Sequence, residues 1–499
     1  MKQLANTLPG TQFLQGDNLG GSTMARGLRD WLHWALVAPL MLAAGLCQAE
    51  LRTVTSGEEL ADALRSAAAG DTIVLRDGEY TLSRQTLRQS GSEQAPITVQ
   101  ALLPGGAQIR ADGVTQFKVY GAHWHFRDLD FQGGAQANHA LHIVAGADHT
   151  VVEGNRFQNF HAAIKGNGEG DPRRFPDHVR IHRNIFVNDG PRNTRYPLVP
   201  IDVVGGKGWQ ITENFITDIG HVAERRGRNS TAAFVKGGAR QAVFDRNVVI
   251  CEWRHQGGQR LGLAFGSGGT EQAFFDRRGL EFCADNDCPE VRDSRMTNNI
   301  ILNCPNGPGV YVTRSENVLI AHNTIYDAYG IQARFPQTRA HITHNLLTGT
   351  VWSRDGAQLE ESHNLYSGQL GVANYLPSIR NRLPETQGHG AEWLVERTLT
   401  GLDWMGERRP AKGLARFENW MVAPAFGNLA LLDESPIVAR GSSTLITDHD
   451  FCGRPRRAPA DIGALEYKTD VPCSLEAELQ RRHGVLFTGL TAPPEAIHP

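Results

Sequence analysis

The residues best suited to move a proton lie around a lysine that two glycines follow. Lys236 ends the apolar run Ala-Phe-Val (233–235), and glycines at 237 and 238 leave room there for a ligand. A buried or positively charged environment makes a lysine a useful base near neutral pH, and we expect neighbouring cations to lower the pKa of Lys236 in this way. Nearby cations also stabilise negative charge that develops in a reaction. We therefore predict catalytic roles for Lys236, Arg254, His255 and Arg260.

Six short segments, including the run that carries Lys236, align with one another, and each is predicted to form a strand. They are HIVAG (142–146), IDVVGG (201–206), AFVKGG (233–238), VYVT (310–313) and IQARF (331–335), with LAFGSGG (263–269) placed between the third and the fourth. Side chains alternate between the two faces of a strand, so the apolar positions point inward and their neighbours outward. The predicted inward residues are Ile201, Val203, Ala233, Val235, Val310, Val312, Ile331 and Ala333.

The outward positions form two columns, which we call the stripe. One column contains His142, Asp202, Phe234, Ala264, Tyr311 and Gln332, and the other contains Val144, Val204, Lys236, Gly266, Thr313 and Arg334. Each coil adds about 4.8 Å, which places Tyr311 roughly 10 Å and Arg334 roughly 14 Å from Lys236. Aromatic rings stack on sugars and cations bind carboxylates or sulfates, so the stripe suits a linear acidic polysaccharide. We predict that the polymer contacts His142, Asp202, Phe234, Tyr311, Gln332 and Arg334.

A recurring asparagine indicates the fold that positions these strands. Apolar residues flank Asn155, Asn184, Asn214, Asn247, Asn299, Asn323 and Asn345, at spacings of 29, 30, 33, 52, 24 and 22 residues by subtraction. Such a period with strand-like flanks and no long helical pattern is typical of a parallel β-helix. We expect each Asn to adopt the left-handed backbone conformation at a bend and to hydrogen-bond the Asn of the next coil. The predicted fold is therefore an all-β, right-handed, single-stranded parallel β-helix.

The chain divides into four predicted parts. Residues 1–49 resemble an export signal, with Met24 as the expected start, an apolar run from Trp31 to Leu46 and cleavage after Ala49. Residues 50–96 contain a capping helix at 58–69, a strand at 72–75 and the first coil. Residues 97–368 form the β-helix, interrupted by loops near 160–176 and 255–292, and 369–499 form an irregular segment packed on it.

The cysteines and the charge limit the setting and the partners. Loss of the signal leaves six of the seven cysteines, and the even number favours disulfides in a periplasmic or secreted protein. Of fifteen possible pairings, we favour Cys283–Cys288, Cys452–Cys473 and Cys251–Cys304, with zinc as the alternative. The net charge of −3 gives no indication of nucleic acid. We expect a monomer without a membrane span after signal cleavage.

The coils and the FVKGG run (234–238) resemble the chondroitinase B-like and alginate lyase-like β-helix polysaccharide lyases. The resemblance covers roughly residues 70–370 for the fold and only Lys236 for mechanism. It implies Lys236 as the base, assisted by an arginine about one coil later and by Ca²⁺. Phe265 and Gly266 stand where that arginine is expected, Arg260 is the nearest substitute, and the family's calcium-binding acids before the lysine are missing. The chain is more similar to exported bacterial β-helix proteins of unsettled activity, which share AF-x-KGG and GL-x-FG-x-GGT.

The predicted function is a lyase that cleaves a uronate-containing polysaccharide by β-elimination. The alternative from another class is a non-catalytic carbohydrate-binding or surface protein that uses the same stripe, and a uronate epimerase is a third reading. A glycoside hydrolase needs two carboxylates about 5–9.5 Å apart, whereas the stripe offers only Asp202. The cofactor that the sequence suggests is Ca²⁺, because Asp285, Asn286 and Asp287 could bind it through oxygen.

Overall fold

The computed structural model describes residues 49–366 and 417–490. Short gaps interrupt these ranges at 112, 223–229, 256–259, 279–287, 305–306, 418, 425–426, 433–434, 436, 445, 468–472 and 488–489. The predicted export signal, apart from Ala49, lies outside the described residues. No helix among the described residues has the length and apolar character to cross a bilayer.

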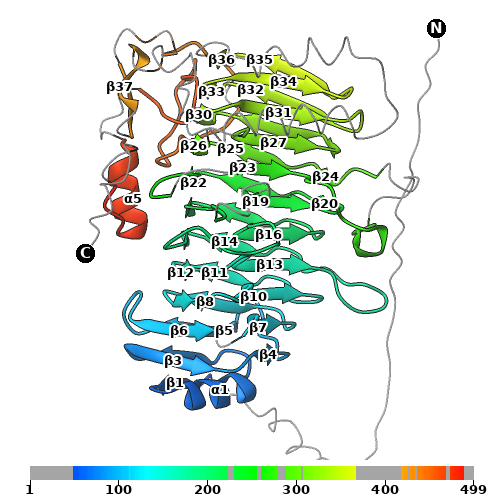
Figure 1. The fold of residues 1–499 in the computed structure, drawn as a ribbon, viewed down its shortest axis with the longest axis vertical. Coiled ribbons are helices and arrows are strands. Elements are labelled where there is room, and N and C mark those ends of the chain that lie inside the picture. Colours follow the sequence, from blue (N-terminus) through cyan, green and yellow to red (C-terminus); the bar gives the residue numbers. More distant parts are fainter. Residues whose placement is uncertain are drawn as a thin grey trace, which may run out of the picture. The chain divides into compact units, whose positions relative to one another are not determined.

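Three long parallel sheets form the body of the molecule, and consecutive coils contribute neighbouring strands to each sheet (Figure 1). The 12-stranded sheet contains β1 (Leu51–Val54), β2 (Thr72–Leu75), β5 (Ile97–Ala101), β8 (Trp124–Arg127), β11 (Val151–Glu153), β14 (Arg180–His182), β17 (Gln210–Thr212), β21 (Val243–Asp245), β25 (Arg295–Thr297), β29 (Val318–Ala321), β32 (Arg339–Thr343) and β35 (Gln358–Ser362). The 11-stranded sheet contains β3 (Gly78–Leu82), β6 (Ala107–Ala111), β9 (Asp130–Gln132), β12 (Arg156–Gln158), β15 (Ile185–Val187), β18 (Phe215–Thr217), β22 (Val248–Ile250), β26 (Ile300–Cys304), β30 (Thr324–Ala328), β33 (Leu346–Leu347) and β36 (Leu365–Tyr366).

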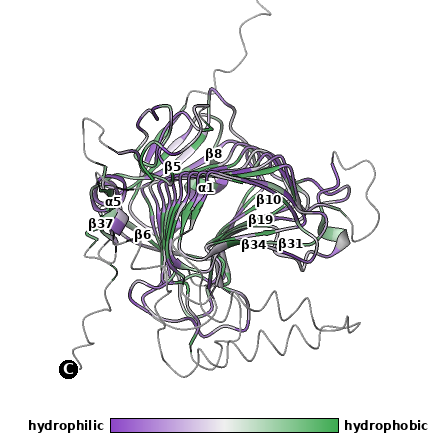
Figure 2. Cartoon of the chain, turned by 90° about the horizontal axis from the view of Figure 1, so that it is seen from above, coloured by the Kyte–Doolittle hydropathy of each residue, from purple (hydrophilic) through white to green (hydrophobic). Residues whose placement is uncertain are grey.

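The third long sheet has ten strands and carries the predicted stripe. It contains β4 (Gln85–Leu87), β7 (Thr115–Val119), β10 (His139–Val144), β13 (Ile164–Asn167), β16 (Ile201–Val204), β19 (Ser230–Lys236), β23 (Arg260–Phe265), β27 (Val310–Thr313), β31 (Gly330–Arg334) and β34 (Thr350–Arg354). A small sheet of β20 (Ala239–Arg240), β24 (Val291–Arg292) and β28 (Ser315–Glu316) follows it at the corner. Seen from above, the strands of successive coils lie over one another (Figure 2). The predicted right-handed parallel β-helix is confirmed.

The Asn ladder joins the 12-stranded sheet to the 11-stranded sheet. Each buried Asn amide donates to the Asn side chain of the next coil over 2.9–3.1 Å, and Asn364 continues the predicted series. The predicted left-handed conformation of the Asn residues is wrong. It belongs instead to the residue before each Asn, for example Arg246 before Asn247 and His322 before Asn323. That residue turns the corner, so the Asn backbone is free to continue toward the next strand.

The N-terminal cap also follows the prediction. Helix α1 (Gly57–Ser66) begins after Ser56, whose side chain accepts from Glu59 N, while the Glu59 carboxylate accepts from Thr55 N over 2.7 Å. This arrangement is a variant of the capping box in which Glu59 binds the residue before the N-cap. The buried face of α1, which includes Leu60 and Leu64, packs on the first coil and covers the apolar interior at this end.

One predicted loop is partly a strand. The interruption near 160–176 contains β13, which pairs with β10 and β16 in register. The pattern Ile-Lys-Gly-Asn lacks apolar alternation because Gly166 fills its inward position beneath the Trp209 ring. The true insertion therefore begins after Asn167, and one additional coil lies between the segments aligned from the sequence.

The C-terminal residues pack on the outer face of the 11-stranded sheet. Helix α5 (Leu475–His483) and the antiparallel pair β37 (Met421–Ala423) and β38 (Asn428–Leu431) belong to this segment. Its Phe417, Met421, Leu429, Phe451, Leu465 and Leu479 share an apolar cluster with Phe215, Ile250, Leu302 and Leu346 of the coils. The disulfides Cys251–Cys304 and Cys452–Cys473 are present as predicted. Cys283 lies outside the described residues.

Candidate functional site

The strand register places the predicted columns side by side on the ten-stranded sheet. His142, Asp202, Phe234, Ala264, Tyr311 and Gln332 share one column, which also contains Lys118, Lys165 and Trp352. The inward positions predicted beside them are all buried. The pattern of alternation therefore gave the inward face of every strand that it included, whereas Lys165 was missed together with β13. Phe234, which was predicted to contact the polymer, is instead only 5% exposed and packs with Val199 and Ala264.

The second column carries Lys236. Val144, Asn167, Val204 and Lys236 are consecutive partners, and further along the sheet Thr313, Arg334 and Arg354 are partners too. Lys236 is the last residue of β19 and is partly buried. Its ammonium lies 4.6 Å from the centre of the Phe234 ring and donates to Gly268 O over 3.0 Å. The side chain is thus held between an aromatic neighbour and the loop after β23.

Burial is the main influence on the pKa of Lys236, and it lowers that pKa from the ordinary value. Asp202 and Glu290 oppose the effect, and Lys165 adds a smaller lowering contribution. The direction of the shift is as predicted, and a neighbouring cation, Lys165, contributes to it, but burial has the larger effect. A lysine with a lowered pKa holds a larger neutral fraction near pH 7, as a general base requires.

The two glycines after Lys236 serve the backbone rather than a ligand. Both adopt left-handed conformations, with φ of 67° at Gly237 and 85° at Gly238. A Cβ on Gly238 would lie 2.1 Å from the carbonyl oxygen of Asp276, and one on Gly237 would meet Val204 and Thr270. The loop that follows β23 thus fills the space directly over these glycines, where room for a ligand was predicted.

Glu290 is a buried carboxylate near Lys236 that the sequence did not indicate. Only 3% of the residue is exposed, and its carboxylate accepts from Ser267 N over 3.3 Å. Burial raises the pKa of Glu290, while Lys236, the Ser267 and Gly268 amides and Arg314 act in the opposite direction. Glu290 follows the long insertion after β23, where no repeat fixes the alignment of coils, so its position could not be deduced.

In the coils before Lys236, polar side chains of the stripe bind one another. Lys165 Nζ donates to Asp202 Oδ1 over 2.7 Å, and these side chains are 20% and 17% exposed. His142 Nε2 lies 2.6 Å from Asn167 Oδ1, and burial lowers the pKa of His142. This part of the surface therefore presents neutral or balanced polar groups.

The part after Lys236 is richer in arginine and aromatic rings. Arg334 forms an ion pair of 2.6 Å with Asp355. Burial acts to lower the pKa of Arg334, but Tyr311 and Asp355 outweigh it, so that the pKa is raised. The Arg314 and Arg334 guanidinium groups lie 4.6 and 4.9 Å from the Phe335 ring centre. Arg354 packs likewise on Trp352 at 4.7 Å. Such stacking holds guanidinium groups in fixed positions at which they can meet carboxylates.

The other three predicted catalytic residues lie away from Lys236. Arg260 is the register partner of Ser230 at the beginning of β19, whereas Lys236 ends that strand, which corresponds to roughly 20 Å at the usual rise of a strand. Arg260 is 1% exposed and pairs with Glu252 over 2.8 Å. Arg254 pairs with Asp218 over 2.8 Å, and the backbone of His255 donates to the same carboxylate. The structure thus brings these three residues to a corner of the coil rather than to the stripe.

Comparison with known proteins relates part of the chain to polysaccharide lyases. Residues 54–169 match the Chondroitinase B family model, in agreement with the resemblance noted from the sequence. This matched segment ends before β19 and does not include Lys236. No curated protein matches the chain.

Solved structures with similar coordinates share little sequence with this chain. The pectate lyase Pel9A is 14% identical with a TM-score of 0.45, and the alignment covers 84% of this chain and 97% of that one. A PL6 family polysaccharide lyase from Pseudopedobacter saltans is 14% identical, with a TM-score of 0.37 and coverage of 63% and 92%. A lacto-N-biosidase from Eubacterium ramulus is 11% identical, with a TM-score of 0.42 and coverage of 64% and 67%.

The described residues offer no grouping of three His, Cys, Asp or Glu side chains suited to a metal ion. Asp285, Asn286 and Asp287, which the sequence suggested for Ca²⁺, lie outside the described residues. The described site brings the Lys236 amine beside polar, aromatic and cationic groups on the outer face of the ten-stranded sheet.

Proposed function

We propose that this protein is a lyase that binds an acidic, uronate-containing polysaccharide along the stripe and cleaves it by β-elimination. The observation that carries the proposal is the partly buried Lys236 amine, whose pKa burial lowers, beside the column that contains His142, Asp202 and Tyr311. The match of residues 54–169 to the Chondroitinase B model supports the same class of reaction.

In the proposed reaction, neutral Lys236 removes the proton beside the uronate carboxylate. Electrons from that C–H bond form the new C=C bond, and the bond to the glycosidic oxygen breaks. The leaving oxygen takes a proton, for which we assign the Lys236 ammonium formed in the first step. Tyr311 would pack on a sugar face, while Arg334, Gln332, Asp202 and His142 would contact polar groups of the chain.

The second candidate is a carbohydrate-binding protein without catalysis. The observation that favours it is the position of the predicted arginines, because Arg260 is buried and Arg254 pairs with Asp218. Neither supplies positive charge beside Lys236. A binding protein would need only the aromatic and arginine-rich part of the stripe.

We also propose an exported, periplasmic or secreted, location. The support is the two disulfides Cys251–Cys304 and Cys452–Cys473, since disulfides persist chiefly in oxidising compartments. Export would also bring the protein to extracellular polysaccharides.

The test is the ultraviolet absorbance of unsaturated uronate, measured over alginate, pectate, glucuronans and glycosaminoglycans with and without Ca²⁺. Lys236→Ala is compared with the wild type and with Lys207→Ala, a lysine outside the two columns. We expect absorbance to rise with one polymer for the wild type and Lys207→Ala and to be lost in Lys236→Ala. If the absorbance rises with no polymer, yet an acidic polymer retards the protein in an affinity gel, the conclusion is a carbohydrate-binding protein in place of a lyase.

A further inference from the structure

The segment Ser267–Gly269 connects Lys236 to the buried Glu290. Lys236 Nζ donates to Gly268 O over 3.0 Å, and Ser267 N donates to the Glu290 carboxylate over 3.3 Å. A further backbone hydrogen bond reaches Glu290 from Gly268. One short loop is thus bound to the amine on one side and to the carboxylate on the other.

The backbone of Glu290 is fixed against the residues that follow Lys236. Its carbonyl oxygen accepts from Gly238 N over 2.8 Å and from Ala239 N over 3.1 Å, and its own N–H donates to Arg314 O. These bonds hold Glu290 between the coils of β19 and β27. The carboxylate consequently has a defined position relative to Lys236, which a surface glutamate would not have.

The charged groups around the pair come from several elements. Asp202 on β16 and Lys165 on β13 face Lys236 from the sheet, and Glu290 faces it from the segment before β24. Arg314, after β27, faces Glu290 from the other side. Burial acts against the charged form of both Lys236 and Glu290, and each favours the charged form of the other.

We propose that Glu290 is a positioning residue for Lys236, which fixes the amine through the Ser267–Gly269 segment and controls its protonation through its negative charge. Glu290 is itself too buried to touch a polymer, so its effect passes through Lys236. This inference rests on the proposed role of Lys236 as the base.

The experiment measures Lys236 without relying on cleavage of any polymer. The full-length protein is labelled with acetic anhydride at a series of pH values, and the rate at Lys236 is read by peptide mass spectrometry. In Glu290→Gln the amide oxygen can still accept from Ser267 N, but the negative charge is gone. We expect the midpoint of Lys236 labelling to move to lower pH, with several-fold faster labelling at neutral pH.

Two further variants make the result specific. Glu316→Gln removes an exposed carboxylate on the same small sheet, which pairs with Arg292 and Arg339, and we expect it to leave the labelling profile unchanged. Glu290→Asp keeps the charge, and we expect it to keep the midpoint near that of the wild type even if the loop loosens. If Glu290→Gln does not fold, Glu290→Asp becomes the test, and a midpoint far from the wild-type value in this charge-conserving variant would overturn control of Lys236 by the charge of Glu290.

The outcomes separate this inference from the proposed function. A folded Glu290→Gln protein whose Lys236 labels with the wild-type profile overturns the role of Glu290. If the profile shifts but the protein cleaves no polymer, the coupling of Glu290 to Lys236 is supported and the proposed lyase activity is rejected. If a polymer is cleaved, the base-limb midpoint of the rate against pH should move to lower pH in Glu290→Gln, as the labelling does.

Discussion

Arg260 and Glu252 form an ion pair of 2.8 Å in the interior of the coil, with side chains only 1% and 3% exposed. Arg260 Nη1 also donates to His255 O over 3.0 Å, so the guanidinium joins the beginning of β23 to the corner after β22. This arrangement gives Arg260 a role in stability, in place of the contact with a polymer expected from the sequence.

Arg260→Ala should therefore destabilise the protein strongly. Removing one partner of a buried ion pair leaves the other charge without compensation, which costs about 3–5 kcal/mol. Chemical denaturation should show this loss of unfolding free energy, whereas Lys236→Ala should change it little. An Arg260→Ala protein of wild-type stability with impaired activity would instead return Arg260 to the site.

The Asn ladder predicts a second large effect on stability. Asn247 donates to Asn299 Oδ1 over 2.9 Å and to Ile211 O over 2.8 Å, and its Oδ1 accepts from the backbone and side chain of Asn214. Each buried group left without a partner costs roughly 1–3 kcal/mol. Asn247→Ala should lower the melting temperature substantially, while Asn193→Ala, at an exposed asparagine outside the ladder, should not. Equal melting temperatures for the two variants would contradict the prediction.

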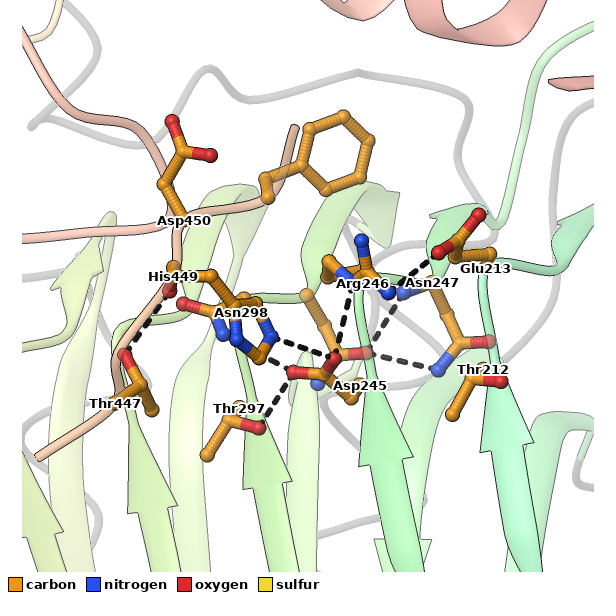
Figure 3. Close-up of polar contacts among 12 residues, drawn as sticks. Thr212, Glu213, Asp245, Arg246, Asn247, Thr297, Asn298, Thr447, His449 and Asp450 are labelled. Carbon is orange, nitrogen blue, oxygen red and sulfur yellow. Dashed lines mark hydrogen bonds and ion pairs between the residues drawn. The ribbon is translucent and has the colours of Figure 1, made fainter. Parts of the chain in front are cut away.

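The contact between the C-terminal segment and the coils should depend on pH. His449 Nε2 lies 3.2 Å from Asp245 Oδ2, and Thr297 and Asn298 donate to the other oxygen of Asp245 (Figure 3). The hydrogen bond to Asp245 raises the pKa of His449 above its ordinary value of 6.5. For Asp245, burial acts to raise the pKa, but the hydrogen bonds from His449, Thr297 and Asn298 outweigh it, so that the pKa lies below 3.8.

The directions of these two pKa shifts define the pH range in which the contact between His449 and Asp245 stabilises the protein. A raised pKa in the folded state means that the His449 contribution is complete below 6.5 and is lost as the pH rises through the folded value. A lowered pKa means that the Asp245 contribution is present above 3.8 and is lost as the pH falls through the folded value. The melting temperature should thus benefit most between these limits, and His449→Gln should remove the benefit. His341→Gln serves as the control, and a pH profile unaltered by His449→Gln would refute the assignment.

The two described disulfides should contribute unequally. Cys251–Cys304 closes a separation of 53 residues and Cys452–Cys473 one of 21. On the chain-entropy relation their removal costs about 4 and about 3 kcal/mol, respectively. Denaturation of the two paired Cys→Ala variants measures the difference. A larger loss for the Cys452–Cys473 pair would show that its attachment of the tail, rather than chain entropy, governs stability.

The sequence predicted the register of the two columns correctly wherever the coil kept its usual length. The distance along the chain from the ten-stranded sheet to the ladder Asn varies little, so Asp202, Phe234 and Tyr311 could be aligned from Asn214, Asn247 and Asn323. Alternation of side chains then separated inward from outward positions. The same reasoning failed for Lys165, because Gly166 replaces the apolar residue expected opposite Trp209.

The insertion after β22 explains the remaining errors. Arg260 follows a loop of irregular length, and nothing in its local sequence indicates that it lies at the buried beginning of β23. Glu290 lies beyond a second irregular loop, where its contact with Ser267 depends on how that loop returns to the sheet. Contacts of this kind are set by tertiary packing, which a repeat pattern does not encode.

The C-terminal segment has a consequence for how the chain unfolds. A solenoid in which each coil touches only its neighbours can fray from its ends. Here Arg456 binds Asn298, 158 residues away, and Arg482 binds the backbone of Arg246, 236 residues away. These non-local contacts raise the contact order and link the central coils into one cooperative unit. Synthesis must therefore reach the last part of the chain before the centre of the solenoid acquires its full stability.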